Sequence, residues 1–64
     1  MKQEQVAKII CFGTYKVVRF TDDDGVYNYR VTYTGAGRTR VLRWFCTLAD
    51  ALAYVKSIVA DKCI

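Results

Sequence analysis

Residues 26–45, VYNYRVTYTGAGRTRVLRWF, decide the predicted fold. Large apolar side chains alternate with polar ones on both sides of a glycine-containing segment at 35–37. A period of two is typical of a half-buried strand, and glycine allows the positive φ angles that tight hairpin turns require. The stretch therefore predicts two antiparallel strands, at 26–34 and 38–46, joined by a hairpin turn.

The segments on either side of this hairpin predict a further strand and a helix. Residues 14–21, TYKVVRFT, are rich in β-branched and aromatic types and end at DDDG, which suits a turn. At Thr47 the period becomes helical, and TLAD places a hydroxyl at the N-cap with an acid three residues later. One face of this helix is apolar and is expected to pack on the sheet. Its residues are Leu48, Ala51, Leu52, Val55, Ile58, Val59 and Cys63.

Residues 1–13 allow two interpretations, because VAKIICF suits an extra strand and KQEQVAKII suits a short amphipathic helix. We favour the strand, with Gly13 as a bend before the next strand. The predicted fold class is α+β: a three-stranded antiparallel meander followed by a C-terminal helix packed on one face (βββα), with an extra N-terminal strand as an option. Without repeats, proline or a linker, residues 1–64 are expected to form a single small domain.

The register of the strands predicts which side chains face the helix. A four-residue loop at 22–25 pairs Thr21 with Val26, and an even-numbered loop around residues 36–37 pairs Val31 with Leu42. The other register of the last strand turns Arg43 towards the helix and is disfavoured, because an unpaired buried guanidinium is costly. The predicted helix-facing set is Val18, Phe20, Tyr27, Tyr29, Val31, Leu42 and Trp44. The predicted open face carries Tyr15, Val17, Arg19, Asn28, Arg30, Thr32, Val41, Arg43 and Phe45.

Ten Lys and Arg residues against six Asp and Glu give a net charge of +4, which favours acidic partners without requiring them. The first functional hypothesis is a small non-enzymatic module that contacts nucleic acid through a basic, aromatic-flanked open face. In it Arg19, Arg30 and Arg43 contact phosphates or guanine edges. Asn28 and Thr32 add hydrogen bonds, Arg38 and Arg40 anchor the turn, and Tyr15 and Phe45 stack on bases. Asp22, Asp23 and Asp24 repel phosphate from the other end of the sheet.

Two further explanations account for the same residues. Tyr15, Val17, Val41 and Phe45 form an apolar patch on the predicted open face, and a protein partner or a second copy in a homodimer would cover it. An inhibitor or accessory protein fits this second hypothesis. The other explanation is that the arginines are ordinary charged side chains of strands, exposed to solvent and without a binding role.

Catalysis and cofactor chemistry find little support in the composition. The chain has no histidine, and Ser57 has no evident base. Cys11, Cys46 and Cys63 lack the paired spacing of a zinc site, and the three aspartates lack the calcium-loop pattern. We predict no enzyme activity, no metal, no cofactor and no small-molecule substrate, and expect the cysteines to be buried, reduced thiols.

No segment has the pattern of a signal peptide, and no apolar run approaches the ~20 residues of a membrane span. We therefore expect a cytoplasmic protein with no membrane partner.

The order of three strands and one packing helix resembles the small sheet-reading DNA-binding domains of plant AP2-type regulators and of some integrase N-termini. TLADALAY, with Thr47, Ala51 and Tyr54, is similar to the helix start of the AP2-type pattern, whose tryptophan and glycine strand signatures are missing. The resemblance implies an architecture and carries over no residue roles.

Overall fold

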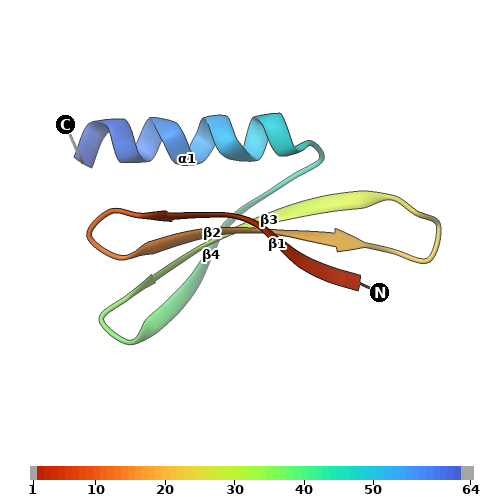
Figure 1. Ribbon diagram of the computed structural model, residues 1–64, viewed down its shortest axis with the longest axis horizontal. Coiled ribbons are helices and arrows are strands. Elements are labelled where there is room, and N and C mark those ends of the chain that lie inside the picture. Colours follow the sequence, from red (N-terminus) through yellow and green to blue (C-terminus); the bar gives the residue numbers. More distant parts are fainter. Residues whose placement is uncertain (1, 63–64) are drawn as a thin grey trace.

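The computed structural model describes residues 2–62 and shows one open antiparallel sheet with a helix lying over one of its faces (Figure 1). The sheet order is β1-β2-β3-β4. The elements are β1 (Lys2–Ile10), β2 (Thr14–Thr21), β3 (Tyr27–Gly35), β4 (Arg38–Phe45) and α1 (Leu48–Lys62). The predicted α+β fold is confirmed, and the N-terminal segment forms the extra strand rather than a helix.

The start of α1 and its apolar stripe agree with the sequence prediction. The Thr47 hydroxyl accepts a hydrogen bond from the Asp50 N–H at 3.2 Å, and the Thr47 carbonyl accepts one from the Ala51 N–H at 3.2 Å. These bonds satisfy N–H groups that the first helical turn otherwise leaves without partners. Ala51 and Val55 are completely buried against the sheet. Leu48, Leu52, Ile58 and Val59 are partly buried there, and Cys63 lies outside the described residues.

The turn between β2 and β3 has an odd number of residues instead of the predicted even number, and this reverses the parity of the strand pairing. Asp22 and Val26 are linked by a backbone hydrogen bond of 3.1 Å, which leaves a three-residue loop ending in Gly25 at φ 79°. The Asp22 carboxylate also accepts hydrogen bonds from the N–H groups of Asp24 and Val26, both at 2.9 Å. Thr21 therefore pairs with Tyr27, and the predicted pairing of Thr21 with Val26 is wrong. A slip of one residue exchanges the two faces of β2 relative to β3.

The turn between β3 and β4 has the predicted even length, but a bulge reverses the faces further along β4. Ala36 and Gly37, at φ 52° and 76°, form a two-residue loop, as the hairpin pattern requires. An irregularity between Val31 and Thr32 then places Val31 opposite Arg43 instead of Leu42. The extra residue, Leu42, packs against the core.

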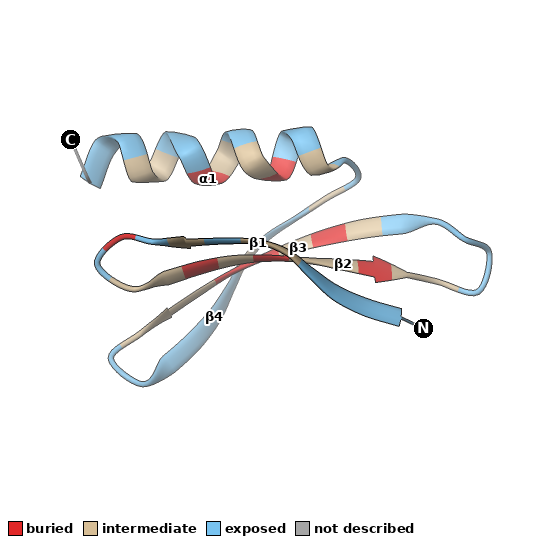
Figure 2. Ribbon diagram, viewed as in Figure 1, coloured by how far each residue is buried: buried red, intermediate tan, exposed pale blue. Residues whose placement is uncertain are grey.

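These two corrections change the composition of the core, which lies between the sheet and α1 (Figure 2). Tyr29, Val31 and Leu42 contribute to it as predicted. Phe20 is 8% exposed but points away from the helix, as Val18 and Trp44 do, so the prediction that these three face α1 is wrong. The buried core residues are Cys11, Tyr15, Val17, Tyr29, Val31, Ala51 and Val55.

The prediction of buried, reduced cysteines is wrong for the two cysteines that the structure describes. Cys11 is buried but disulfide-bonded, whereas Cys46 is free but exposed. Cys63 lies outside the described residues. Disulfides are rare in cytosolic proteins, so the bond at Cys11 weighs against the expected cytoplasmic localisation.

Candidate nucleic-acid interface

The side of the sheet away from α1, here called the uncovered face, has no other described element over it (Figure 1). The strand register assigns its residues, because paired residues point to the same side of a sheet and their neighbours to the other. From β1 to β4 they are Gln3, Gln5, Lys8, Ile10, Thr14, Lys16, Val18, Phe20, Asn28, Arg30, Thr32, Thr34, Thr39, Val41 and Trp44.

The uncovered face is positively charged with no opposing charge. Lys8 on β1 pairs directly with Lys16 on β2, and Arg30 lies in the adjacent row on β3. All six acidic residues of the chain lie within the described range, and none of them is on this face. Like charges directly opposite each other destabilise a sheet, so the Lys8–Lys16 pair brings no benefit to the fold.

Arg30 contacts two aromatic rings that also contact each other. Its Cζ atom is 4.6 Å from the centroid of the Phe20 ring and 5.8 Å from that of Trp44, and the two ring centroids are 5.2 Å apart. This cluster, the Arg30 stack, explains how Phe20 is buried on a face without a covering layer. Stacking orients the guanidinium before any ligand arrives. Trp44 remains 51% exposed, so one aromatic surface is open to solvent.

The guanidinium of Arg30 is incompletely satisfied within the described residues. Its Nε atom is buried and has no hydrogen-bond partner there. Within residues 2–62, the salt bridge that the structure shows joins Arg19 to Glu4. Arg30 therefore has no carboxylate partner among these residues. A stacked arginine without a counter-ion is a strong binding group for an anion with oxygen acceptors, such as phosphate.

Polar side chains surround the Arg30 stack. Asn28 lies two residues before Arg30 on β3, and Thr32, two residues after Arg30, pairs directly with Lys16 on β2. The hydroxyl groups of Thr34 and Thr39 are hydrogen-bonded to each other at 2.9 Å. Of the residues predicted to contact nucleic acid, Asn28, Arg30 and Thr32 thus lie on the same face, although Thr32 is only 6% exposed.

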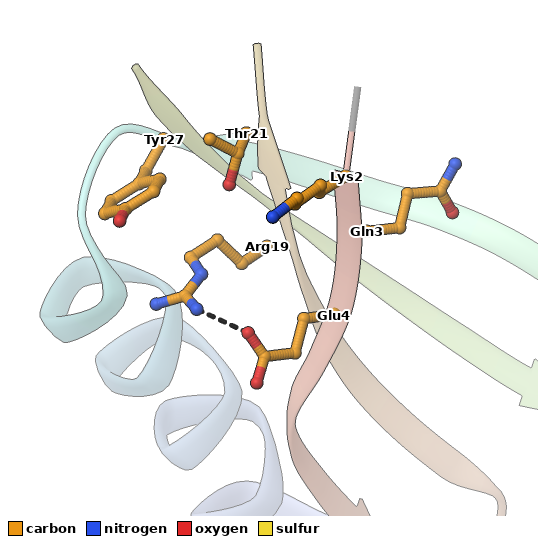
Figure 3. Close-up of a pocket in the computed structure, with 6 residues that line it drawn as sticks. All are labelled: Lys2, Gln3, Glu4, Arg19, Thr21 and Tyr27. Carbon is orange, nitrogen blue, oxygen red and sulfur yellow. Dashed lines mark hydrogen bonds and ion pairs between the residues drawn. The ribbon is translucent and has the colours of Figure 1, made fainter. Parts of the chain in front are cut away.

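Arg19 does not join this group, contrary to the predicted open face. The odd-numbered turn places it on the helix-facing side, opposite Tyr29 and beside Glu4, with which it forms a salt bridge (Figure 3). It also lies over the Tyr27 ring, 4.8 Å from the centroid. Partial burial lowers the pKa of Arg19, but the hydrogen bond and charge of Glu4 outweigh this effect and the net shift of the pKa is upward. Its charge is therefore neutralised locally.

The arginines of β4 lie at the edge of the sheet rather than at the centre of the uncovered face. Arg38 and Arg40 are exposed near the β3–β4 turn, and they pair with Gly35 and Tyr33. Arg43 pairs with Val31 on the helix-facing side, yet it is exposed and stacks over Phe45 at 5.4 Å. The predicted cost of burying Arg43 does not arise, because β4 is an edge strand from which a long side chain reaches solvent.

The two aromatic residues predicted to stack on bases are both directed to the core side. Tyr15 is 2% exposed and lies 4.8 Å from the Tyr33 ring centroid, so its predicted stacking role is wrong. Phe45 packs against Tyr54 of α1, with ring centroids 5.3 Å apart, and the same correction applies. The aromatic residue that the site does present is Trp44, which the sequence interpretation had assigned to the core.

Lys8, Lys16 and Trp44 were missed as site residues. A usable signal was present in DDDG, because an aspartate that caps its own loop, followed by a glycine with positive φ, is typical of a three-residue hairpin loop. Predicting this three-residue loop would by itself have placed Lys16 and Phe20 on the open face. No comparable signal marks the β4 bulge in the sequence.

The described residues hold no group of three or more side chains suited to a metal ion. Among residues 2–62 there is also no helix with the length and apolarity that a membrane crossing requires.

Searches of protein-family models, curated proteins and solved structures found no match to this chain. The architectural resemblance to AP2-type domains and integrase N-termini thus gains no support from sequence or structure comparison.

Proposed function

We propose that this protein is a small non-enzymatic module that binds nucleic acid through the uncovered face. The observation that carries the proposal is the Arg30 stack, which lies next to the Lys8–Lys16 pair on a face without carboxylates. Phosphates release counterions when they meet such cations, and this release supplies much of the affinity for nucleic acid.

The stack also favours one form of nucleic acid. Trp44 is half exposed beside the Arg30 guanidinium, and an exposed ring stacks on a base only where the face of that base is free. Bases in a duplex are already stacked on their neighbours. We therefore expect the protein to bind single strands more tightly than duplexes, with Arg30 and the two lysines contacting the backbone and Asn28 adding a hydrogen bond.

The residues at the sheet margin have a smaller part in this proposal. Arg38 and Arg40 lie near the β3–β4 turn, where they extend the positive potential towards one end of the sheet. Arg43 lies at the β4 edge outside the uncovered face, where it stacks over Phe45. Arg19 has no part, because Glu4 neutralises it on the opposite side.

Fluorescence anisotropy tests the proposal. Labelled single-stranded and duplex oligonucleotides of random sequence are titrated with protein at several salt concentrations. With three central cations, the logarithm of the affinity for a single strand should fall with the logarithm of salt concentration with a slope of about −2.

Matched variants locate the interface in the same assay. Arg30→Ala should weaken binding, whereas Arg19→Ala, which removes an arginine from the other side, should leave it unchanged. Equal losses in the two variants would place the contact elsewhere. Absence of binding at low salt would end the proposal.

A protein partner is the second candidate, and the exposure of apolar side chains on the same face favours it. Val41 is 53% exposed, close to the value for Trp44. Two uncovered faces meeting in a homodimer would bring Lys8, Lys16 and Arg30 of both copies together, and like charges oppose such contact. An acidic partner protein fits this face better than a second copy. Light scattering coupled to size-exclusion chromatography measures whether the chain dimerises.

A further inference from the structure

A second feature lies at the end of the sheet where β1 turns into β2. Ile10 is 74% exposed and Phe12 is 79% exposed, the highest values among the large hydrophobic side chains of the described residues. These two residues, here called the apolar tip, pack against no described core. Large apolar groups left this open in a small protein usually mark a contact surface.

The backbone of the apolar tip is held in a conformation that phenylalanine rarely adopts. Phe12 has φ 51°, in the left-handed region that disfavours bulky residues. The Tyr33 hydroxyl donates a hydrogen bond to the Phe12 carbonyl at 2.6 Å, and the Cys11 N–H donates one to the Gly13 carbonyl at 2.9 Å. The Tyr33 ring fills the space at Gly13, where an added Cβ would come within 2.5 Å of its hydroxyl.

The Phe12 side chain itself contributes no packing to the fold, because it remains in water. Backbone strain of this kind persists where the surrounding structure imposes it, and it concentrates at functional positions. The turn therefore presents an aromatic side chain to solvent rather than to the core.

Cations gather at the same end of the molecule. They come from four elements: Lys8 of β1, Lys16 of β2, Arg38 and Arg40 of β4, and Lys62 of α1. The β1–β2 turn, the β3–β4 turn and the C-terminal end of α1 all lie at this end (Figure 1). Asp61 is the acidic residue on the last turn of α1.

The opposite end has the opposite character. Asp22, Asp23 and Asp24 occupy the β2–β3 turn there, together with Glu4 near the start of β1. The molecule is 39 Å long. It is thus polarised along its length, with the two most exposed large apolar side chains and four of the eight strand cations at one end and a run of carboxylates at the other.

We propose that the apolar tip docks on the surface of an anionic lipid bilayer. Phe12 and Ile10 enter the boundary between headgroups and acyl chains, and the surrounding cations attract the anionic headgroups. The acidic end then points away from the surface. This peripheral contact needs no membrane-spanning helix, and it differs from the expectation of no membrane partner drawn from the sequence. The apolar tip itself lies apart from the Arg30 stack, although Lys8 and Lys16 belong to both proposed surfaces.

Co-sedimentation with vesicles tests the proposal, using phosphatidylcholine alone and phosphatidylcholine mixed with phosphatidylserine. The protein should sediment with the mixed vesicles and not with phosphatidylcholine alone. Phe12→Gly is the sharpest variant, because glycine adopts positive φ without strain and the turn is retained while the ring is removed. Loss of a phenylalanine ring that inserts into the bilayer should weaken vesicle binding about tenfold or more.

Val26→Asp supplies the matched control. Val26 is also an exposed apolar turn residue, 53% exposed, but it lies at the acidic end, so its replacement should leave vesicle binding unchanged. Circular dichroism shows whether each variant is folded. No sedimentation with the mixed vesicles at low salt, or equal binding by Phe12→Gly and the native chain, would overturn the proposal. Unchanged nucleic-acid affinity in Phe12→Gly would show that the two surfaces act separately.

Discussion

Arg30 and Trp44 are paired directly across β3 and β4, and the guanidinium carbon of Arg30 lies 5.8 Å from the centre of the Trp44 ring. This pair joins a cation and an exposed aromatic surface on the face of the sheet that α1 leaves open. The proposed binding function rests on this combination, because the charge attracts a phosphate and the ring offers a surface to a neighbouring base.

Trp44 should report nucleic-acid binding through its own fluorescence. It is the single tryptophan of the chain, so the tryptophan emission, excited selectively over the five tyrosines, comes from the proposed site alone. Stacking of a base on the half-exposed indole should quench this emission in proportion to the fraction bound. Titration with unlabelled single-stranded oligonucleotide measures the effect. Binding detected by anisotropy without any change in Trp44 emission would remove this residue from the interface.

Replacing Arg30 by lysine should weaken nucleic-acid binding although the charge is retained. A lysine ammonium is not planar, so it cannot lie over the Phe20 and Trp44 rings as the guanidinium does. We expect a loss of about 1 kcal/mol in binding and a similar loss in the free energy of unfolding. Anisotropy and urea denaturation measure the two quantities. An Arg43→Lys variant is the control, since Arg43 stacks on Phe45 outside the uncovered face and should affect binding little.

Replacing Asp22 by alanine should destabilise the β2–β3 hairpin. The Asp22 carboxylate accepts two backbone hydrogen bonds, from Asp24 and Val26. Because the turn is exposed, water replaces part of the lost hydrogen bonding. We therefore expect the free energy of unfolding to fall by about 1 kcal/mol. Asp24→Ala, in the same loop, tests whether the effect comes from these bonds or from charge. Equal destabilisation by the two variants would contradict the capping role of Asp22.

Two glycines with positive φ should respond differently to alanine. Gly25, at φ 79°, has open space around it, so Gly25→Ala should cost only the backbone strain, about 1 kcal/mol. At Gly13, φ 138°, the added Cβ also meets the Tyr33 ring, and Gly13→Ala should cost clearly more, about 3 kcal/mol. Thermal or urea unfolding measures both. Similar costs at the two positions would show that Tyr33 moves aside easily.

Phe12→Gly should leave the stability of the protein unchanged or raise it slightly. The substitution removes the strain of a bulky residue at φ 51° and adds the entropy cost of glycine, and these contributions are both about 1 kcal/mol. The removed ring is exposed, so no packing is lost. A large destabilisation, measured by urea unfolding, would instead assign Phe12 a structural role and weaken the case for a docking surface.

The order and type of the elements followed from local patterns in the sequence. The alternation in TYKVVRFT and VYNYRVTYT predicted strands, and Thr47 with Asp50 predicted the start of α1, which the Thr47 cap confirms. Such signals lie within a few residues of the structure that they specify, because backbone angles, turns and caps are short-range interactions. The N-terminal strand was harder to predict, since its sequence also suits a helix.

The composition of the candidate site depended on register. Asn28, Arg30 and Thr32 were placed on the open face, because the alternation within β3 is independent of its neighbours. Arg19, Tyr15 and Phe45 were misplaced, because their positions relative to β3 depend on one loop length and one bulge. A change of one residue at either point exchanges the faces of a strand.

The sequence by itself determined three strands, their antiparallel order along the chain and the helix with its buried stripe, and it allowed the fourth strand at the N-terminus. Only the tertiary structure decided which side of the sheet α1 covers, and therefore that Tyr15 is buried while Trp44 is exposed. The physical reason is that each strand offers apolar residues on both sides, so its local pattern does not choose between them. The choice comes from the Asp22 turn and from the bulge that directs Leu42 into the core.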